Sequence, residues 1–235
     1  MIFSQIYPFT HLLIGICELW LAVWSIRLWF KSKSVAVIVL LILLLGISYD
    51  NLLLATGRLI GLGELLKSLS QVRFLIHHFV VPFLIVVGVE LAHRIGAVWA
   101  NNFTRSLAWL LSISLGFIDI FNRYIGTKLE PIYFAGVLRY TASFSGGLPI
   151  ITIAVTLFVL LIGIGIWIRS RKTWYWLFVG TLIALIVNAF PLSLVGTLLG
   201  SLAELFMTLT LLLTERYIQR NPAIVLSDPS VLDRV

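Results

Sequence analysis

The sequence has few of the polar and charged residues that a soluble protein needs on its surface. Of its 235 residues, 11% are charged and 60% are hydrophobic, and the mean hydropathy is +1.06. A soluble domain of this length cannot bury so much apolar side chain, so a lipid bilayer is the solvent that fits the composition. The single cysteine, Cys17, lies inside the first apolar run, which excludes an intrachain disulfide.

The motifs of several common chemistries are also missing. The chain has no Gly-rich phosphate loop, no Cys cluster, and neither His-x-x-x-His nor His-Glu-x-x-His. The sequence therefore predicts no nucleotide or metal site and identifies no cofactor. The last apolar run contains neither His nor Lys. It therefore lacks the paired histidines of seven-helix alkaline ceramidases and progestin-receptor-like hydrolases, and the lysine of a retinal-binding protein.

Seven apolar runs are long enough, or nearly so, to cross a hydrocarbon core of about 30 Å. They lie at residues 9–30, 35–56, 74–93, 105–122, 148–168, 174–190 and 195–214. The runs are continuous rather than alternating, which argues against membrane strands. The sequence predicts an all-α integral membrane protein. One seven-helix bundle over residues 1–220 is followed by a flexible cytoplasmic tail over residues 221–235.

The net charge of +7 reflects the placement of basic residues between the apolar runs, where they set the topology and do not indicate nucleic acid. Eleven lie on the side of the C-terminus and six on the other side. The positive-inside rule then places the N-terminus outside and the C-terminus in the cytoplasm, as in a plasma (inner) membrane protein. No basic residue precedes the first run, so we interpret it as a retained helix rather than a signal peptide.

Two connections on the predicted outer side are expected to form short interfacial helices. Between runs two and three, apolar residues recur at helical spacing over residues 59–72, with polar residues on the opposite face. Between runs four and five, Pro131 is suited to the first turn of a helix over residues 132–140.

Most polar residues inside the apolar runs fall in the predicted outer half. A charge in hydrocarbon is costly unless it is paired or hydrated, so these residues are functional candidates and predict one outward-facing pocket. The candidate ligand-binding residues are Glu18, Asp50, Asn51, Arg58, Arg73, His77, His78, Asp119, Arg123 and Glu204. Asp50, His77 and Glu204 are also the candidates for catalysis. His11 is expected at the membrane interface.

Helical spacing suggests partners for some of these groups. Asp119 and Arg123 are four residues apart and are expected to pair. Arg73 and His77 are also four apart, and Asp50 across the turn is their predicted counter-charge. Proline 82 is expected to interrupt the third helix, because it lacks the amide that would bond the His78 carbonyl.

The sequence leaves three functional classes open. The first is a binding protein for a lipid headgroup, a small amphipath or a membrane protein partner, in which Arg58, Arg73, Arg123 and Arg139 suit an anionic phosphate. The second is a hydrolase acting on a lipid, with Ser48 or Ser70 beside a histidine. The third is a proton- or ion-coupled transporter that uses Glu18 and Glu204.

Overall fold

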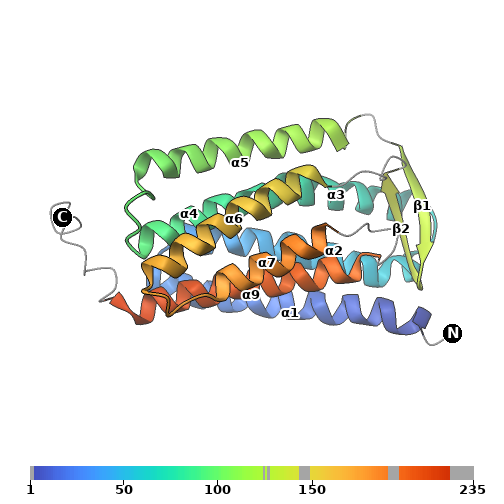
Figure 1. The fold of residues 1–235 in the computed structure, drawn as a ribbon. Helices are drawn as coiled ribbons and strands as arrows, with labels where there is room; N and C mark the ends of the chain where they lie inside the picture. The colour runs from blue at the N-terminus through green and yellow to red at the C-terminus, as the bar shows by residue number, and fades with distance from the viewer. Residues whose placement is uncertain (1–2, 124, 126–127, 143–148, 190–195, 223–235) are drawn as a thin grey trace.

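The computed structural model describes residues 3–123, 125, 128–142, 149–189 and 196–222, without the side chains of residues 3–5 and 123. The chain forms a bundle of long helices with one β-hairpin at an end (Figure 1). The helices are α1 (Phe3–Ser32), α2 (Val35–Ile60), α3 (Glu64–Val80), α4 (Leu84–Arg94), α5 (Asn102–Arg123), α6 (Ile150–Arg169), α7 (Trp176–Asn188) and α9 (Leu198–Arg220). The predicted tail lies outside the described residues from residue 223 onward.

Within the described residues, six helical segments are long and apolar enough to span a bilayer, which is compatible with a polytopic helical membrane protein. They are Ile6–Ser32, Val35–Ile60, Glu64–Arg94, Asn102–Asn122, Ile150–Arg169 and Leu198–Arg220. The remaining apolar helix, α7, has 13 residues and at about 1.5 Å per residue reaches only about 20 Å. The predicted span at 174–190 is thus represented by a short helix, and the number of seven spans stays a prediction.

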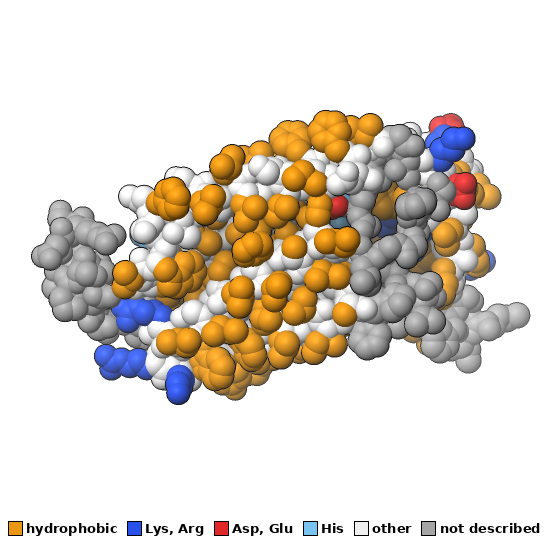
Figure 2. Space-filling model, turned by 45° about the horizontal axis from the view of Figure 1, so that its top comes forward, with side chains coloured by type: hydrophobic (Ala, Val, Ile, Leu, Met, Phe, Trp, Pro, Cys, Tyr) orange, Lys and Arg blue, Asp and Glu red, His pale blue; other side chains and the backbone are white. Residues whose placement is uncertain are grey.

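Successive spans run in opposite directions, with α3 and α4 in line as one of them, so the hairpin and the start of α1 share one end of the bundle (Figure 1). We call this the hairpin end, and the end at which α9 finishes the opposite end. The apolar core lies where α2, α4, α6, α7 and α9 meet. Apolar side chains also cover the visible outer face along the bundle, with basic side chains gathered at its ends, as a bilayer environment requires (Figure 2).

The third spanning segment begins earlier than predicted. The expected interfacial helix over residues 59–72 is instead divided between the last residues of α2 and the first turns of α3, with Gly61 and Gly63 at positive φ between them. The predicted interruption at Pro82 appears as a 3-10 turn, Val81–Phe83, which leads from α3 into α4. Ser112 of α5 donates a hydrogen bond to the Pro82 carbonyl at 2.9 Å, which satisfies an acceptor at the break.

The predicted helix over residues 132–140 is wrong. This segment forms an antiparallel hairpin of β1 (Leu129–Phe134) and β2 (Val137–Ala142). The two loop residues, Ala135 and Gly136, have φ values of 47° and 89°, and positive φ at both positions is what a two-residue type I′ turn requires. Strand β2 turns alternate side chains, including the buried Val137 and Thr141, toward the bundle.

The hairpin lies directly on the backbone of α2. A Cβ added at Gly57 would overlap the carbonyl oxygen of Leu138 on β2, so glycine is what allows this contact. We expect Gly57→Ala to push the hairpin outward and to lower the free energy of unfolding by about 1–3 kcal/mol. Unfolding in mixed detergent micelles measures the change. Gly200→Ala is the matched control, because a Cβ there meets nothing within 4 Å; equal effects of the two changes would contradict the close contact.

Candidate functional site

Asn51 of α2 connects two side chains of α1 in the interior of the bundle. Its amide nitrogen donates to both carboxyl oxygens of Glu18, at 3.1 and 3.0 Å, and to the Ile47 carbonyl at 3.2 Å. Its amide oxygen lies 2.8 Å from His11 Nδ1, which therefore carries the hydrogen. Asn51, Glu18 and His11 are all fully buried. The expectation that His11 lies at the interface is therefore wrong.

The same group reaches the start of α9. The second imidazole nitrogen of His11, Nε2, lies 3.1 Å from the Thr197 hydroxyl, which precedes α9. One turn away, the Tyr7 hydroxyl accepts a hydrogen bond from the Leu198 amide at 3.0 Å. Within the described residues, Glu18 has no Lys, Arg or His partner, so its hydrogen bonds come from the neutral Asn51 amide. Polar contacts from three helices meet here, far apart in the sequence.

Asp50 and Arg73 form an ion pair between α2 and α3. Arg73 Nη1 donates to Asp50 Oδ1 at 2.8 Å, and both side chains are largely shielded from solvent. This confirms Asp50 as the counter-charge that was predicted for Arg73 across the turn between the two helices. Nη2 of the same guanidinium reaches the carbonyl of Tyr140 on β2 at a long 3.5 Å. The ion pair therefore lies immediately beneath the hairpin.

His77 lies between two carboxylates that belong to different helices. Its Nδ1 is 3.9 Å from Asp50 Oδ2 on α2, and its Nε2 is 4.0 Å from Glu204 Oε1 on α9. Both distances exceed a direct hydrogen bond. A neutral imidazole has one N–H donor and an imidazolium has two, so only the protonated ring could donate to both carboxylates. The arrangement joins α2, α3 and α9 through one titratable side chain.

The adjacent histidine makes a separate contact. His78 Nδ1 lies 2.7 Å from Asp119 Oδ2 on α5, and its ring stacks on Phe74 with centroids 5.8 Å apart. His77 and His78 are perpendicular to each other, so the two imidazoles serve different neighbours. The predicted partner of Asp119, Arg123, has a side chain outside the described part of the chain, and the Asp119–Arg123 pair stays a prediction.

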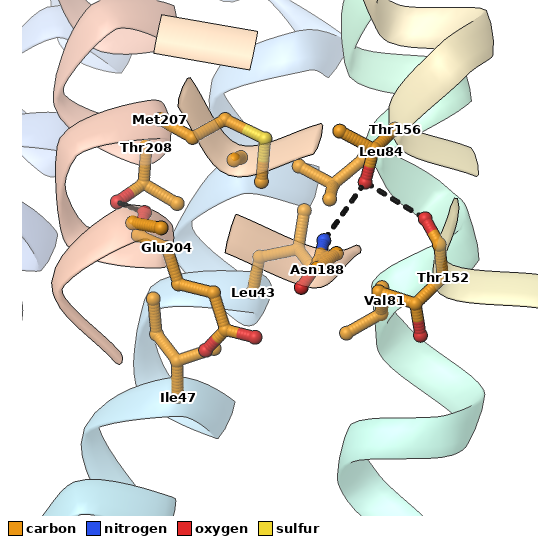
Figure 3. Close-up of a pocket in the computed structure, with 12 residues that line it drawn as sticks. Leu43, Ile47, Val81, Leu84, Thr152, Thr156, Asn188, Glu204, Met207 and Thr208 are labelled. Carbon is orange, nitrogen blue, oxygen red and sulfur yellow. Dashed lines mark hydrogen bonds between the residues drawn. The ribbon is translucent and has the colours of Figure 1, made fainter. Parts of the chain in front are cut away.

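A cavity of about 20 Å³ lies between α2, α4, α6, α7 and α9, beside this network. Glu204 of α9 and Asn188 of α7 project into it, and the Thr156 hydroxyl faces Asn188, among mostly apolar side chains (Figure 3). Asn188 donates a weak hydrogen bond to Thr156 at 3.4 Å, and the Thr156 hydroxyl donates to the Thr152 carbonyl at 2.7 Å. The volume suffices for about one water molecule.

Arg139 was not among the predicted ligand-binding residues, although it was one of the four arginines considered suitable for binding a phosphate. It lies on β2 between the inward-facing Val137 and Thr141, so its side chain is on the face that covers the bundle. Burial and then the charge of Arg73 lower the pKa of Arg139 to about 10, against the opposite effect of Asp50. The alternation of β2 was the signal for this position, and it was missed because a helix was expected.

Three other residues that the sequence suggested, Arg58, Ser48 and Ser70, form no hydrogen bond or ion pair with the charged side chains of the cluster in the described structure. Arg58 is exposed near the end of α2, and no hydrogen bond or ion pair to it occurs among the described residues. The two serines considered as nucleophiles are buried, but within the described residues neither forms a hydrogen bond with a histidine. Ser48 donates to the Leu44 carbonyl at 2.6 Å, and Ser70 Oγ has no hydrogen-bond partner.

A second polar cluster lies at the opposite end and ties helices together. Arg105 of α5 binds Glu90 of α4 through two hydrogen bonds, at 2.8 and 3.1 Å. Arg94 of α4 is paired with the buried Glu215 of α9, to which Gln219 also donates at 2.7 Å. No group of three or more His, Cys, Asp or Glu side chains placed to hold a metal occurs in the described part of the chain.

Comparisons of the chain with protein-family models, with curated proteins and with solved structures found no match.

Proposed function

We propose that this polytopic membrane protein binds a lipid headgroup or small amphipath at the hairpin end of the bundle. The observation that carries the proposal is the convergence of charged and titratable side chains from four elements beneath the hairpin. They are Asp50 of α2, Arg73 and His77 of α3, Arg139 of β2 and Glu204 of α9. Such groups are costly in a bilayer, and their concentration under one cap is typical of a binding site.

The proposal includes a change of shape at the hairpin end. The cavity beside Glu204 has room for about one water molecule, which is too small for a headgroup. The hairpin does not line this cavity, but it covers the charged cluster, which it contacts through the 3.5 Å approach of Arg73 to the Tyr140 carbonyl. Its displacement would open the site around Arg73. In the predicted plasma membrane orientation, this end meets the outer leaflet.

Native mass spectrometry of the detergent-purified protein tests the proposal. We expect the wild-type protein to retain a lipid or amphipath in about one-to-one ratio, and the double change His77→Gln and Glu204→Gln to reduce that retention severalfold, because it removes two of the converging groups. The matched control is Glu90→Gln with Arg105→Gln, a paired polar site at the opposite end. Retention lost equally in both double variants, or no bound lipid in the wild type, would refute the proposal.

A second function, movement of protons, is favoured by one observation. His77 lies about 4 Å from a carboxylate on each side, and one of these carboxylates, Glu204, lines the cavity. This spacing suits exchange of a proton through an intervening water. In proteoliposomes with an internal pH-sensitive dye, we expect an imposed pH gradient to collapse faster with wild-type protein than with Glu204→Gln. Equal rates for wild type, variant and empty vesicles would exclude proton movement.

A further inference from the structure

One edge of the Arg73 guanidinium is left without strong acceptors in the interior. Nη1 is occupied by Asp50 at 2.8 Å, whereas the buried Nε has no hydrogen-bond partner and Nη2 reaches the Tyr140 carbonyl only at 3.5 Å. Nε and Nη2 form the side of the guanidinium that binds two oxygens of one anion in parallel. A buried donor without an acceptor is rare in folded proteins and destabilising, so this edge needs an acceptor.

A further buried donor lies on the same face of α3. Ser70, three residues before Arg73, is fully buried, and its hydroxyl has no hydrogen-bond partner. Positions three apart on a helix are neighbours on its surface. The hydroxyl and the free edge of Arg73 are thus two unsatisfied hydrogen-bonding groups on one helix face, close to the hairpin.

The local charge also favours an anion. Arg73 contacts the carbonyl of Tyr140, the residue next to Arg139 on β2. The charge of Arg73 helps to lower the pKa of Arg139, whereas Asp50, the ion-pair partner of Arg73, has the opposite effect. Among Arg73, Arg139 and Asp50 alone, two positive charges and one negative charge leave an excess of one positive charge. Although burial lowers its pKa to about 10, Arg139 stays protonated at neutral pH.

We propose that the free edge of Arg73, the Ser70 hydroxyl and Arg139 together bind a phosphate group, which replaces the Tyr140 carbonyl as acceptor. This inference rests on the proposed binding function and names the chemistry of its ligand. A carboxylate would use the Arg73 edge alone, whereas a tetrahedral phosphate has further oxygens for Ser70 and Arg139. The phosphate belongs either to a lipid headgroup or to a free anion.

Thermal unfolding in a phosphate-free detergent separates these sources. The probes are inorganic phosphate and short-chain phosphatidate, compared with chloride at equal ionic strength and with uncharged diacylglycerol of the same chain length. Stabilisation of the wild type by inorganic phosphate identifies a free anion. Stabilisation by phosphatidate alone identifies a headgroup. No stabilisation beyond chloride and diacylglycerol overturns the inference without any variant being needed.

Substitutions then test the residues. Arg73→Lys keeps the charge beside Asp50 but removes the two-donor edge, and Arg139→Gln removes the second charge. Each is expected to weaken binding of the effective probe about tenfold, the scale of losing a charge-assisted hydrogen bond. Arg27→Gln, an exposed arginine in the last third of α1, is the control and should leave the affinity unchanged. Wild-type affinity in both folded variants overturns the assignment.

The two proposals fail in distinguishable ways. If the purified protein retains a lipid, and diacylglycerol stabilises it as much as phosphatidate does, the binding function stands and the phosphate site does not. If the protein retains no lipid and responds to none of the probes, both proposals fail.

Discussion

Asn51→Ala is expected to lower the free energy of unfolding by about 3–5 kcal/mol, the largest effect of any single polar truncation at the hairpin end. Alanine removes the donor to both oxygens of Glu18 and the acceptor for His11. Both partners are fully buried, so no bulk water replaces the lost bonds. Each buried group left unsatisfied costs about 1–3 kcal/mol, and more if it is charged. Creation of a small cavity adds to the loss.

Reversible unfolding in mixed detergent micelles, followed by tryptophan fluorescence, measures this effect. Asn122→Ala is the matched control, because Asn122 is exposed near the end of α5 and its truncation is expected to change stability by less than about 0.5 kcal/mol. A loss below about 1 kcal/mol for Asn51→Ala would show that Asn51 does not organise the buried contacts between α1 and α2.

Arg94→Leu at the opposite end is expected to lower the free energy of unfolding by about 3–5 kcal/mol. The change leaves the carboxylate of Glu215 buried without its charged partner, and an unpaired buried charge is far more costly than the pair is stabilising. Gln219 still donates to Glu215, but a neutral amide does not compensate the charge.

The double change Arg94→Leu and Glu215→Leu distinguishes this explanation from simple loss of packing. With both charges gone, we expect recovery of most of the lost stability, because an apolar pair avoids the desolvation penalty. Arg27→Leu, an exposed arginine in the last third of α1, controls for the loss of a positive charge at this end. A double variant no more stable than Arg94→Leu alone would contradict the assignment of the loss to an unpaired carboxylate.

The membrane character and the positions of the helices follow from the sequence because bilayer thickness imposes a minimum length on each apolar run. Asp50 and Arg73 were also paired correctly, since the short connection between their helices brings both residues to one level of adjacent helices. Glu204 was expected near the middle of the last run, within reach of the same outward-facing pocket, and it lies 4.0 Å from His77. The length of an apolar run and the position of a polar residue within it can both be determined from a single sequence.

The hairpin and the role of His11 depend on tertiary contacts that the sequence does not display. The segment over residues 129–142 contains Pro131 and several aromatic residues, a composition that suits either a helix or a strand. The close contact between its Leu138 carbonyl and Gly57 of α2 favours the strand. His11 was placed by depth alone at the interface. Its burial results from Asn51 and from Thr197, which is 186 residues away in the chain.

The contacts between the first and last helices have a consequence for biogenesis. Near one end of α1, Tyr7 and His11 hydrogen-bond the start of α9, and near the other end Gln219 of α9 donates to the Leu28 carbonyl at 3.2 Å. The ribosome synthesises α1 before α9. Until α9 is in place, some polar groups of α1 lack their hydrogen-bond partners. A nascent chain halted before Thr197 would expose that side, a feature by which membrane quality control can distinguish unfinished from completed protein.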